Sequence, residues 1–182
     1  MSTLKVGTIQ DHANSNTGME LHSTGGIKTL KRPQVHLAST KSDGTYAISN
    51  GDFSIGGSLG LTSGSSAIDC SFDANGKMTV THAGLYMVYA YIYLYQNSTS
   101  GVATLAAYKG TTGSAPYGTS GTQFANLDVF EWNGVSAGRI DYGLGGQAPV
   151  VLSANESVHF YITNTDYFSG PRFHRCGIFK LD

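Results

Sequence analysis

The sequence predicts an all-β fold built from antiparallel strands. From Pro33 onward, short segments rich in β-branched and aromatic residues recur between Gly, Asn, Asp and Ser, and no segment has a convincing helical pattern. This spacing is typical of a β-sandwich or barrel. Glycine-rich stretches at 56–64 and 110–121 are expected to be exposed loops. The expected strands are residues 34–39, 67–73, 77–82, 85–95, 102–109, 122–132, 138–144, 149–153, 157–164 and 172–181.

The composition changes near residue 32. Residues 1–32 contain only isolated apolar residues, such as Leu4, Val6 and Ile9, between polar and glycine-containing turns. Such a segment cannot bury a core alone, so it lies on copies of itself or on another protein, or else stays mobile. The remaining length suits one domain of ordinary size. We therefore expect a docking or trimerisation arm at 1–32 and one β-domain at 33–182.

Charge and hydropathy exclude two classes of partner. Only 13% of the 182 residues are charged and the formal net charge is -1, so there is no basic stripe to follow a phosphate backbone. No apolar run approaches the roughly 20 residues of a membrane-spanning helix. We expect neither nucleic-acid binding nor membrane insertion.

Segment 85–95 has two apolar faces of different chemistry, because side chains alternate along a strand. One face is mostly aliphatic and consists of Tyr86, Val88, Ala90, Ile92 and Leu94. The other consists of Met87, Tyr89, Tyr91, Tyr93 and Tyr95. An exposed apolar patch of this kind usually marks an interface, and each tyrosine buries about 150–250 Å². We expect the second face to drive self-association; the alternatives are cover by the same chain or a solvent-facing ladder.

Segment 157–164 repeats this alternation. Val158, Phe160 and Ile162 fall on one side and are expected to face the core, whereas His159, Tyr161 and Thr163 fall on the other. We include Tyr161 among the predicted interface residues. The pattern agrees with a two-layer sandwich.

Motifs of known catalytic chemistry are weak. Residues 56–60 have the spacing of a nucleophile elbow and residues 143–148 that of a dinucleotide fingerprint, but neither lies between a strand and a helix. Glycan hydrolysis needs two converging carboxylates, and the i, i+3 spacing of Asp128 and Glu131 on a strand separates them. We expect no catalytic residue and no cofactor. The alternative, a glycan depolymerase, would depend on Asp128, Glu131 or Asp141.

The two cysteines, Cys70 and Cys176, lie far apart in the sequence and outside any Cys/His spacing of a metal site. We expect two buried thiols and no metal. The alternative, a disulfide, would need an oxidising environment.

Three stretches resemble the globular domain of the C1q/TNF-like family. The run 72–88 has an Asn-Gly turn, a Thr-containing strand and then Gly84-Leu85-Tyr86 at the entry to a long strand. Residues 151–158 resemble the family's turn between two late strands, with Asn155-Glu156 where Gly-Asp is usual, and residues 176–181 resemble its last strand. The resemblance implies a ten-strand jelly roll over 33–182 that forms a homotrimer.

Residues 2–11 resemble the N-termini of structural proteins from phages of cyanobacteria and other aquatic bacteria, which are often tail-fibre, knob or capsid-decoration proteins. The resemblance implies a virion surface protein that docks on other virion proteins through Leu4, Val6 and Ile9. The N-terminus lacks a secretory signal pattern. We therefore expect synthesis in the host cytoplasm and release by lysis, and the alternative is a cellular secreted C1q-like recognition protein.

A virion surface protein of this kind would also serve host attachment. Exposed aromatic rings stack on sugar faces and are the natural contacts for a host cell-surface glycan. The candidate residues are Tyr108, Tyr117, Trp132, Tyr167 and Phe168.

Overall fold

The chain forms two compact units, Met1–Arg32 and Pro33–Asp182. The computed structural model describes residues 8–11, 16–21, 27–29, 32–39, 47–48, 53–54, 66–73, 76–96, 100–113, 117–133, 140–164, 168–169 and 173–181. The regular secondary structure within these ranges consists of β-strands alone. The all-β prediction is therefore confirmed for the described part of the chain.

The first unit contains a three-stranded antiparallel sheet in the order β1-β2-β3. Its strands are β1 (Thr8–Asp11), β2 (Asn16–Leu21) and β3 (Ile27–Thr29). Ile9 pairs with Met19 across the first two strands. No strand was predicted here, because the apolar residues of 1–32 are too sparse to produce a recognisable strand pattern.

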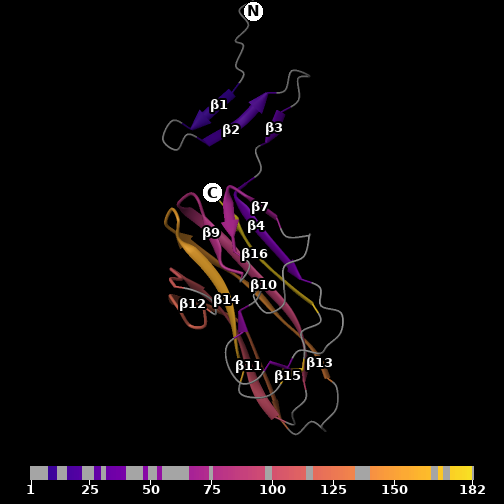
Figure 1. Ribbon diagram of the computed structural model, residues 1–182. Helices are drawn as coiled ribbons and strands as arrows, with labels where there is room; N and C mark the ends of the chain where they lie inside the picture. Colours follow the sequence, from indigo (N-terminus) through magenta and orange to yellow (C-terminus); the bar gives the residue numbers. More distant parts are fainter. Residues whose placement is uncertain are drawn as a thin grey trace, which may run out of the picture. The chain divides into compact units, whose positions relative to one another are not determined.

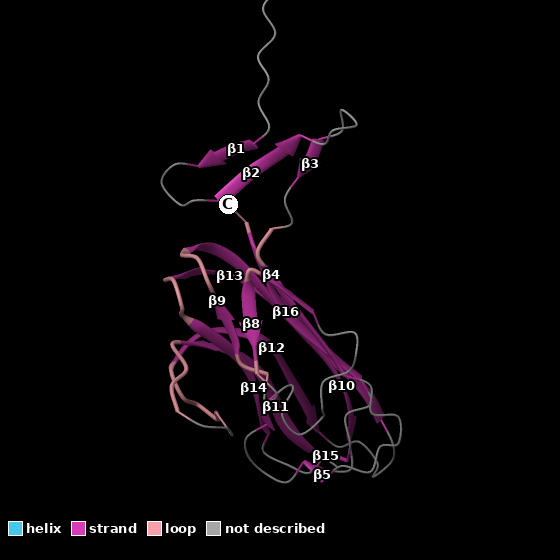
Figure 2. Ribbon diagram, turned by 45° about the horizontal axis from the view of Figure 1, so that its top comes forward, coloured by secondary structure: helices cyan, strands magenta, loops and turns pink. Residues whose placement is uncertain are grey.

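The second unit is a sandwich of two antiparallel sheets (Figure 1; Figure 2). The first, which we name the β10 sheet, contains β4 (Gln34–Ser39), β5 (Ala47–Ile48), β7 (Ser66–Ile68), β10 (Gly84–Gln96), β13 (Ile140–Leu152), β15 (Phe168–Ser169) and β16 (Phe173–Lys180). The second, the β11 sheet, contains β6 (Phe53–Ser54), β8 (Cys70–Phe72), β9 (Met78–Val80), β11 (Ser100–Lys109), β12 (Thr122–Asn133) and β14 (Ser157–Asn164).

Strand β10 occupies a central place in its sheet. It pairs along its whole length with β13 on one side, and with β16 and then β15 on the other. Beyond β16 the sheet continues through β4 to β7. The other sheet has the order β12-β11-β14-β9-β8, with β6 pairing the far end of β14.

The core lies between the two sheets and takes alternate residues from each strand. On β10 the inward residues Tyr86, Val88 and Ile92 are fully buried, as is Phe160 on β14. The inward faces predicted for both strands are therefore correct. Burying one such aliphatic side chain contributes about 1.5–3 kcal/mol. The one polar group in this row, the Tyr86 hydroxyl, donates to the His82 carbonyl at 2.7 Å.

Strand β13 is a single continuous strand, although the sequence analysis predicted two, at 138–144 and 149–153. The two predicted segments left out residues 145–148, and the continuous strand also contains Pro149. Among the described ladders β13 pairs only with β10, so it is an edge strand. Two kinds of opposed pair alternate along an antiparallel ladder, so Pro149 and Gly145, four pairs apart, belong to the same kind. The Gly145 N–H points away from β10, since it donates to Asp128 on β12. The missing N–H of Pro149 therefore falls on the outer edge, where no ladder bond is lost.

The turn between β13 and β14 depends on Asn155 and Glu156. Asn155 has a φ of 63°, in the left-handed region that favours glycine, and asparagine is one of the few other residues that tolerate it. Its N–H donates to the Val80 carbonyl at 2.8 Å, while the Glu156 carboxylate accepts from the Ser153 N–H at 2.8 Å. Asn155 and Glu156 thus fix this turn through one backbone hydrogen bond and one side-chain hydrogen bond.

Residues 110–113 and 117–121, part of the predicted exposed loop at 110–121, do not simply project into solvent. Thr111 and Tyr117 are both buried against the outer face of the β11 sheet. Thr111 Oγ1 lies 2.6 Å from His159 Nδ1, and His159 Nε2 donates to the Gly118 carbonyl at 2.8 Å. The prediction of an exposed loop therefore agrees with most of these residues and was wrong for Thr111 and Tyr117, because glycine content indicates a flexible backbone but not which side chains are covered. The other predicted loop, 56–64, lies outside the described residues.

Aromatic rings complete this cover. The ring of Tyr108 stacks on His159 at a centroid distance of 5.3 Å, and Tyr117 packs on the same imidazole at 5.6 Å. The Tyr117 hydroxyl donates to the Asp73 carboxylate, and the Lys77 ammonium lies 4.9 Å from the centre of the Tyr117 ring. His159 is therefore the central residue of a buried polar cluster that holds the loop on the sheet.

The two cysteines are free thiols. Cys176 is buried, as predicted, and burial raises its pKa. Cys70 is only partly buried, and its burial raises the pKa to about 11. Both thiols are therefore protonated at neutral pH, which makes them poor nucleophiles.

We predict that stability decreases on acidification because of His159. Burial is the main cause that holds the pKa of His159 below its ordinary value of 6.5, with the Lys77 charge as a smaller one. As the pH falls below about 6.5, the unfolded chain binds a proton that the folded imidazole refuses. The free energy of unfolding, measured by urea titration, should be constant above this pH and fall below it. His159→Gln should reduce that dependence, and an unchanged profile would contradict the assignment.

Candidate functional site

The outer face of the β10 sheet carries a continuous row of apolar side chains, which we name the tyrosine face. Its described members are Leu85, Met87, Tyr89 and Tyr91 on β10, Pro149 and Val151 on β13, and Phe179 on β16. Exposed surface remains at Leu85 (38%), Tyr91 (42%) and Val151 (67%). Monomeric proteins rarely present contiguous apolar surface of this kind without a function for it.

Tyr89 reaches across a glycine to a histidine. Gly177 on β16 pairs with both Tyr89 and His36, so it lies between them in one row of the sheet. A Cβ at position 177 would lie 2.5 Å from the Tyr89 hydroxyl. Because glycine leaves this space open, the hydroxyl lies 2.5 Å from His36 Nδ1 with the two rings stacked at 6.2 Å. On its other side Tyr89 packs on Phe179 at 6.4 Å.

The electrostatics of this pair favour its neutral form. Burial raises the pKa of the Tyr89 hydroxyl, so the phenol keeps its proton. Burial, and next the Arg175 guanidinium, hold the pKa of His36 below its ordinary value. A neutral hydroxyl and a neutral imidazole therefore share this hydrogen bond at neutral pH, and the charge closest to the pair in the sheet is the Arg175 guanidinium, opposite Tyr91 on β16.

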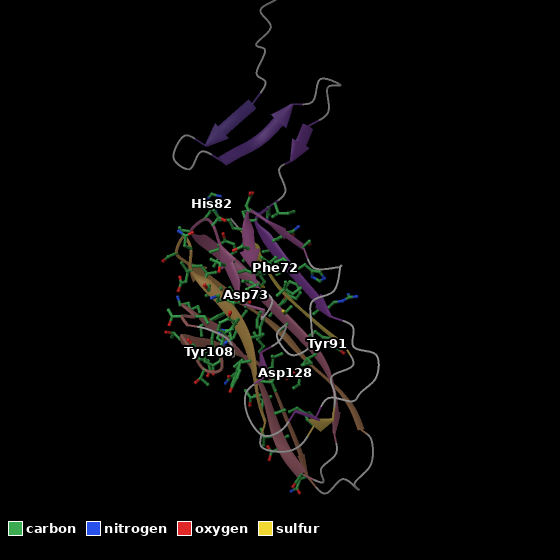
Figure 3. All side chains as sticks on the ribbon, in the orientation of Figure 1. Phe72, Asp73, His82, Tyr91, Tyr108 and Asp128 are labelled. Carbon is green, nitrogen blue, oxygen red and sulfur yellow. The ribbon has the colours of Figure 1, made fainter. Side chains whose placement is uncertain are left out.

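Tyr91 lies against the neighbouring strand. It pairs with Gly145 on β13, and Gly143 is the next residue on the same face. A Cβ at 145 would lie 2.6 Å from Tyr91 Cδ2, and one at 143 would lie 2.5 Å from its hydroxyl. The ring therefore spans the two glycines. Figure 3 labels Tyr91 on the opposite side of the sandwich from Tyr108 of the β11 sheet.

Asp128 closes the edge of β13 beside this site. One oxygen of its carboxylate accepts from the Gly145 N–H at 2.9 Å, and the other accepts from the Val129 N–H at 2.9 Å. Next to this contact, a Cβ on Gly146 would lie 2.4 Å from the Leu127 carbonyl oxygen, so β12 and β13 approach very closely. The carboxylate therefore connects the two sheets by satisfying backbone donors.

The positions of Asp128, Glu131 and Asp141 test whether a pair of carboxylates converges, as a glycan depolymerase would need. Glu131 is exposed, and its position three residues along β12 places it on the other face from Asp128. Asp141 lies in β13, and its side chain is outside the described part.

Among the described residues, no group of three or more His, Cys, Asp or Glu side chains is placed to hold a metal ion. Nor does any helix there have the length and apolar character to cross a membrane.

The predicted interface residues divide into three groups. Met87, Tyr89 and Tyr91 lie on the tyrosine face. Tyr93 and Tyr95 continue β10 in the same register, but their side chains are outside the described part. Tyr161 does not belong with them: it is 1% exposed on the outer face of the β11 sheet, beside Tyr108, so its own chain covers it.

The candidate glycan contacts also need correction. Tyr108 and Tyr117 are only 6% and 5% exposed, because the loop after β11 and the His159 cluster enclose them. A sugar would find no open ring face on either. Trp132 and Phe168 lie in β12 and β15, with side chains outside the described part, and Tyr167 lies outside the described residues. For these three the expectation stays a prediction. The docking residues Leu4 and Val6 likewise lie outside the described residues.

Sequence reasoning missed the glycines and the histidine of the face. Gly143 and Gly145 were considered only as part of a weak dinucleotide fingerprint. Their i, i+2 spacing would have indicated one face of a strand without side chains, had β13 been recognised as continuous. His36 gave no such signal, because its partner Tyr89 lies 53 residues away.

Comparison with protein-family models gives no match, and no curated protein matches the sequence. Among solved structures, the chain is similar to Eiger TNF from S. frugiperda, with a TM-score of 0.50 and 14% sequence identity. The similarity covers 84% of this chain and 94% of that chain. At this identity it shows the fold alone. The second unit is a TNF-like jelly-roll sandwich, as the sequence resemblance implied.

We predict that Asp128→Asn destabilises the chain by about 1–3 kcal/mol, because an amide NH₂ would face one of the two backbone donors that the carboxylate now accepts. Urea unfolding measures the loss, and amide hydrogen exchange at Gly145 should accelerate. The matched control is Glu131→Gln, at an exposed position of the same strand. Equal stability of the two variants would refute the edge-closing role of Asp128.

Proposed function

We propose that the protein is a non-enzymatic surface module that works as a homotrimer, with the tyrosine face covered by neighbouring copies. The observation that carries the proposal is the exposed row formed by Leu85, Tyr91 and Val151 on the outer face of the β10 sheet. The His36–Tyr89 pair beside it is neutral, so the charge that a covering copy has to accommodate is that of Arg175, which lies opposite Tyr91 on β16 and is exposed. The C1q/TNF-like sequence resemblance supports three as the number of copies.

The free energy gained by covering a single tyrosine ring is too small to hold the copies together, so we expect the whole tyrosine face to be covered. Covering apolar surface contributes about 25 cal/mol per Å², so one half-exposed tyrosine supplies only a few kcal/mol. Association costs an estimated 4–15 kcal/mol in lost freedom of motion, and stable interfaces bury about 800 Å² on each partner. We therefore expect the row from Leu85 and Val151 past Met87 to Tyr91 to be covered as a whole, together with surface around it.

The proposed location is the surface of a virion, where the protein serves as a fibre, knob or capsid decoration. The support is the resemblance of residues 2–11 to phage structural proteins, together with the separate unit formed by Met1–Arg32. This unit would dock on other virion proteins, and Ile9 in β1 is the described member of its docking residues. Host attachment through surface glycans would then use residues near Trp132, Tyr167 and Phe168.

We predict that the full chain has the mass of a trimer in solution, measured by light scattering or native mass spectrometry. Tyr91→Ser should raise the dissociation constant by about tenfold or more, because it removes an aromatic contact from every interface. The matched control is Val129→Ser, which removes an exposed side chain (54%) on β12, away from the tyrosine face. A stable wild-type monomer, or an equal effect of the two substitutions, would overturn the proposal.

We predict that an antibody raised against the purified chain decorates particles released by lysis of cells in which the gene is expressed. Immuno-electron microscopy checks this, and the pattern distinguishes tail from head. Replacing Leu4, Val6 and Ile9 together with Ser should remove the label from particles while the protein in solution keeps its oligomeric mass. Labelling confined to soluble protein in the wild type would refute the virion location and leave self-association untouched.

A further inference from the structure

Strand β13 presents two residues without side chains to the tyrosine face at the point where a large ring needs space. The ladder places Gly145 opposite Tyr91 and Gly143 opposite Tyr93. The backbone does not require glycine at either position, since neither residue has the positive φ that marks six other described glycines. The reason for glycine at 143 and 145 is therefore the space above them.

The distances show what fills this space. The three heavy atoms nearest to a Cβ built at 143 all belong to Tyr91: the hydroxyl oxygen at 2.5 Å, Cζ at 3.0 Å and Cε2 at 3.1 Å. At 145 the nearest atoms are Tyr91 Cδ2 at 2.6 Å and the Ala90 carbonyl oxygen at 3.3 Å. The base of the ring thus lies over Gly145 and its hydroxyl end over Gly143. One side of the ring rests on the strand, and the ring remains 42% exposed.

We propose that Gly143 and Gly145 are positioning residues for self-association, which hold the Tyr91 ring down on β13 so that its open side faces the neighbouring copy. This inference rests on the proposed function. With a methyl group at 143 the ring would have to lift or swing away, since real contacts of a Cβ do not fall below 3.0 Å. A lifted ring would separate surfaces that must match closely at the centre of an interface.

Two other glycines near the face have a different role. A Cβ at Gly177 would lie 2.4 Å from the Val35 carbonyl oxygen, and one at Gly146 would lie 2.4 Å from that of Leu127. Backbone atoms cannot move aside as a side chain can, so substitution at 146 or 177 would disturb the sandwich itself. Position 143 is the one whose three closest neighbours are all atoms of a movable ring, which makes it the informative site for substitution.

We predict that Gly143→Ala in the full chain raises the dissociation constant of the oligomer by about tenfold, because the ring is displaced in every subunit. Sedimentation equilibrium over a dilution series measures the constant. Glu131→Gln is the matched control, at an exposed position on β12 in the other sheet, and it should leave the constant unchanged. Unaltered association of Gly143→Ala would overturn the inference while leaving the proposed function intact, whereas a monomeric wild type would remove both.

A double-mutant cycle separates positioning from a general effect on the strand. In a Tyr91→Ser chain the ring is absent, so adding Gly143→Ala should change the dissociation constant less than about twofold. An equal shift in both backgrounds would show that the methyl group acts on β13 and not through Tyr91. If Gly143→Ala alone fails to fold, Gly143→Ala/Tyr91→Ser must still fold, because the atoms nearest the new methyl group are gone. Failure of that double variant to fold would also overturn the inference.

Discussion

The alternation of side chains along β10 is the constraint on which the rest of the structure depends. Strands pair with β10 on both sides, so its two rows of side chains can only point above and below the sheet. The lower row, from Tyr86 to Ile92, fills the core against the β11 sheet. The upper row is apolar as well, and the described residues give it only partial cover, through His36 and Phe179. A one-residue change in register would exchange the two rows and destroy both surfaces.

The strands were predictable where a period of two coincides with clear turn residues. Segments 34–39 and 157–164 match β4 and β14 at both ends. The prediction of two strands in place of β13 was wrong, because residues 145–148 (Gly-Gly-Gln-Ala) show no apolar alternation, and only their pairing with β10 identifies them as strand. The interface prediction was wrong for Tyr161, because alternation identifies the side of a strand on which a residue lies but not what covers that side.

The polar cluster around His159 illustrates the same limit. Its contacts join residues 41 and 48 positions apart in the sequence, and no local pattern signals such pairs. Tyr108 and Tyr117 therefore resembled surface aromatics although they are buried. In the candidate site the large residues of β10 were identifiable from their spacing. The glycines under the Tyr91 ring, Gly143 and Gly145, were not identifiable. A glycine can be recognised as space for a ring only when the neighbouring strand and its register are known.

The contact between Asp128 and the Gly145 N–H has a consequence for the form of any assembly. An open strand edge invites a further strand, and repeated addition leads to fibres without a defined end. On the β13 side this route is obstructed, because a carboxylate already occupies an outward backbone donor and β12 lies directly alongside. Copies that meet at this end of the sheet are left with contacts between sheet faces, and such contacts can close into a ring of fixed size.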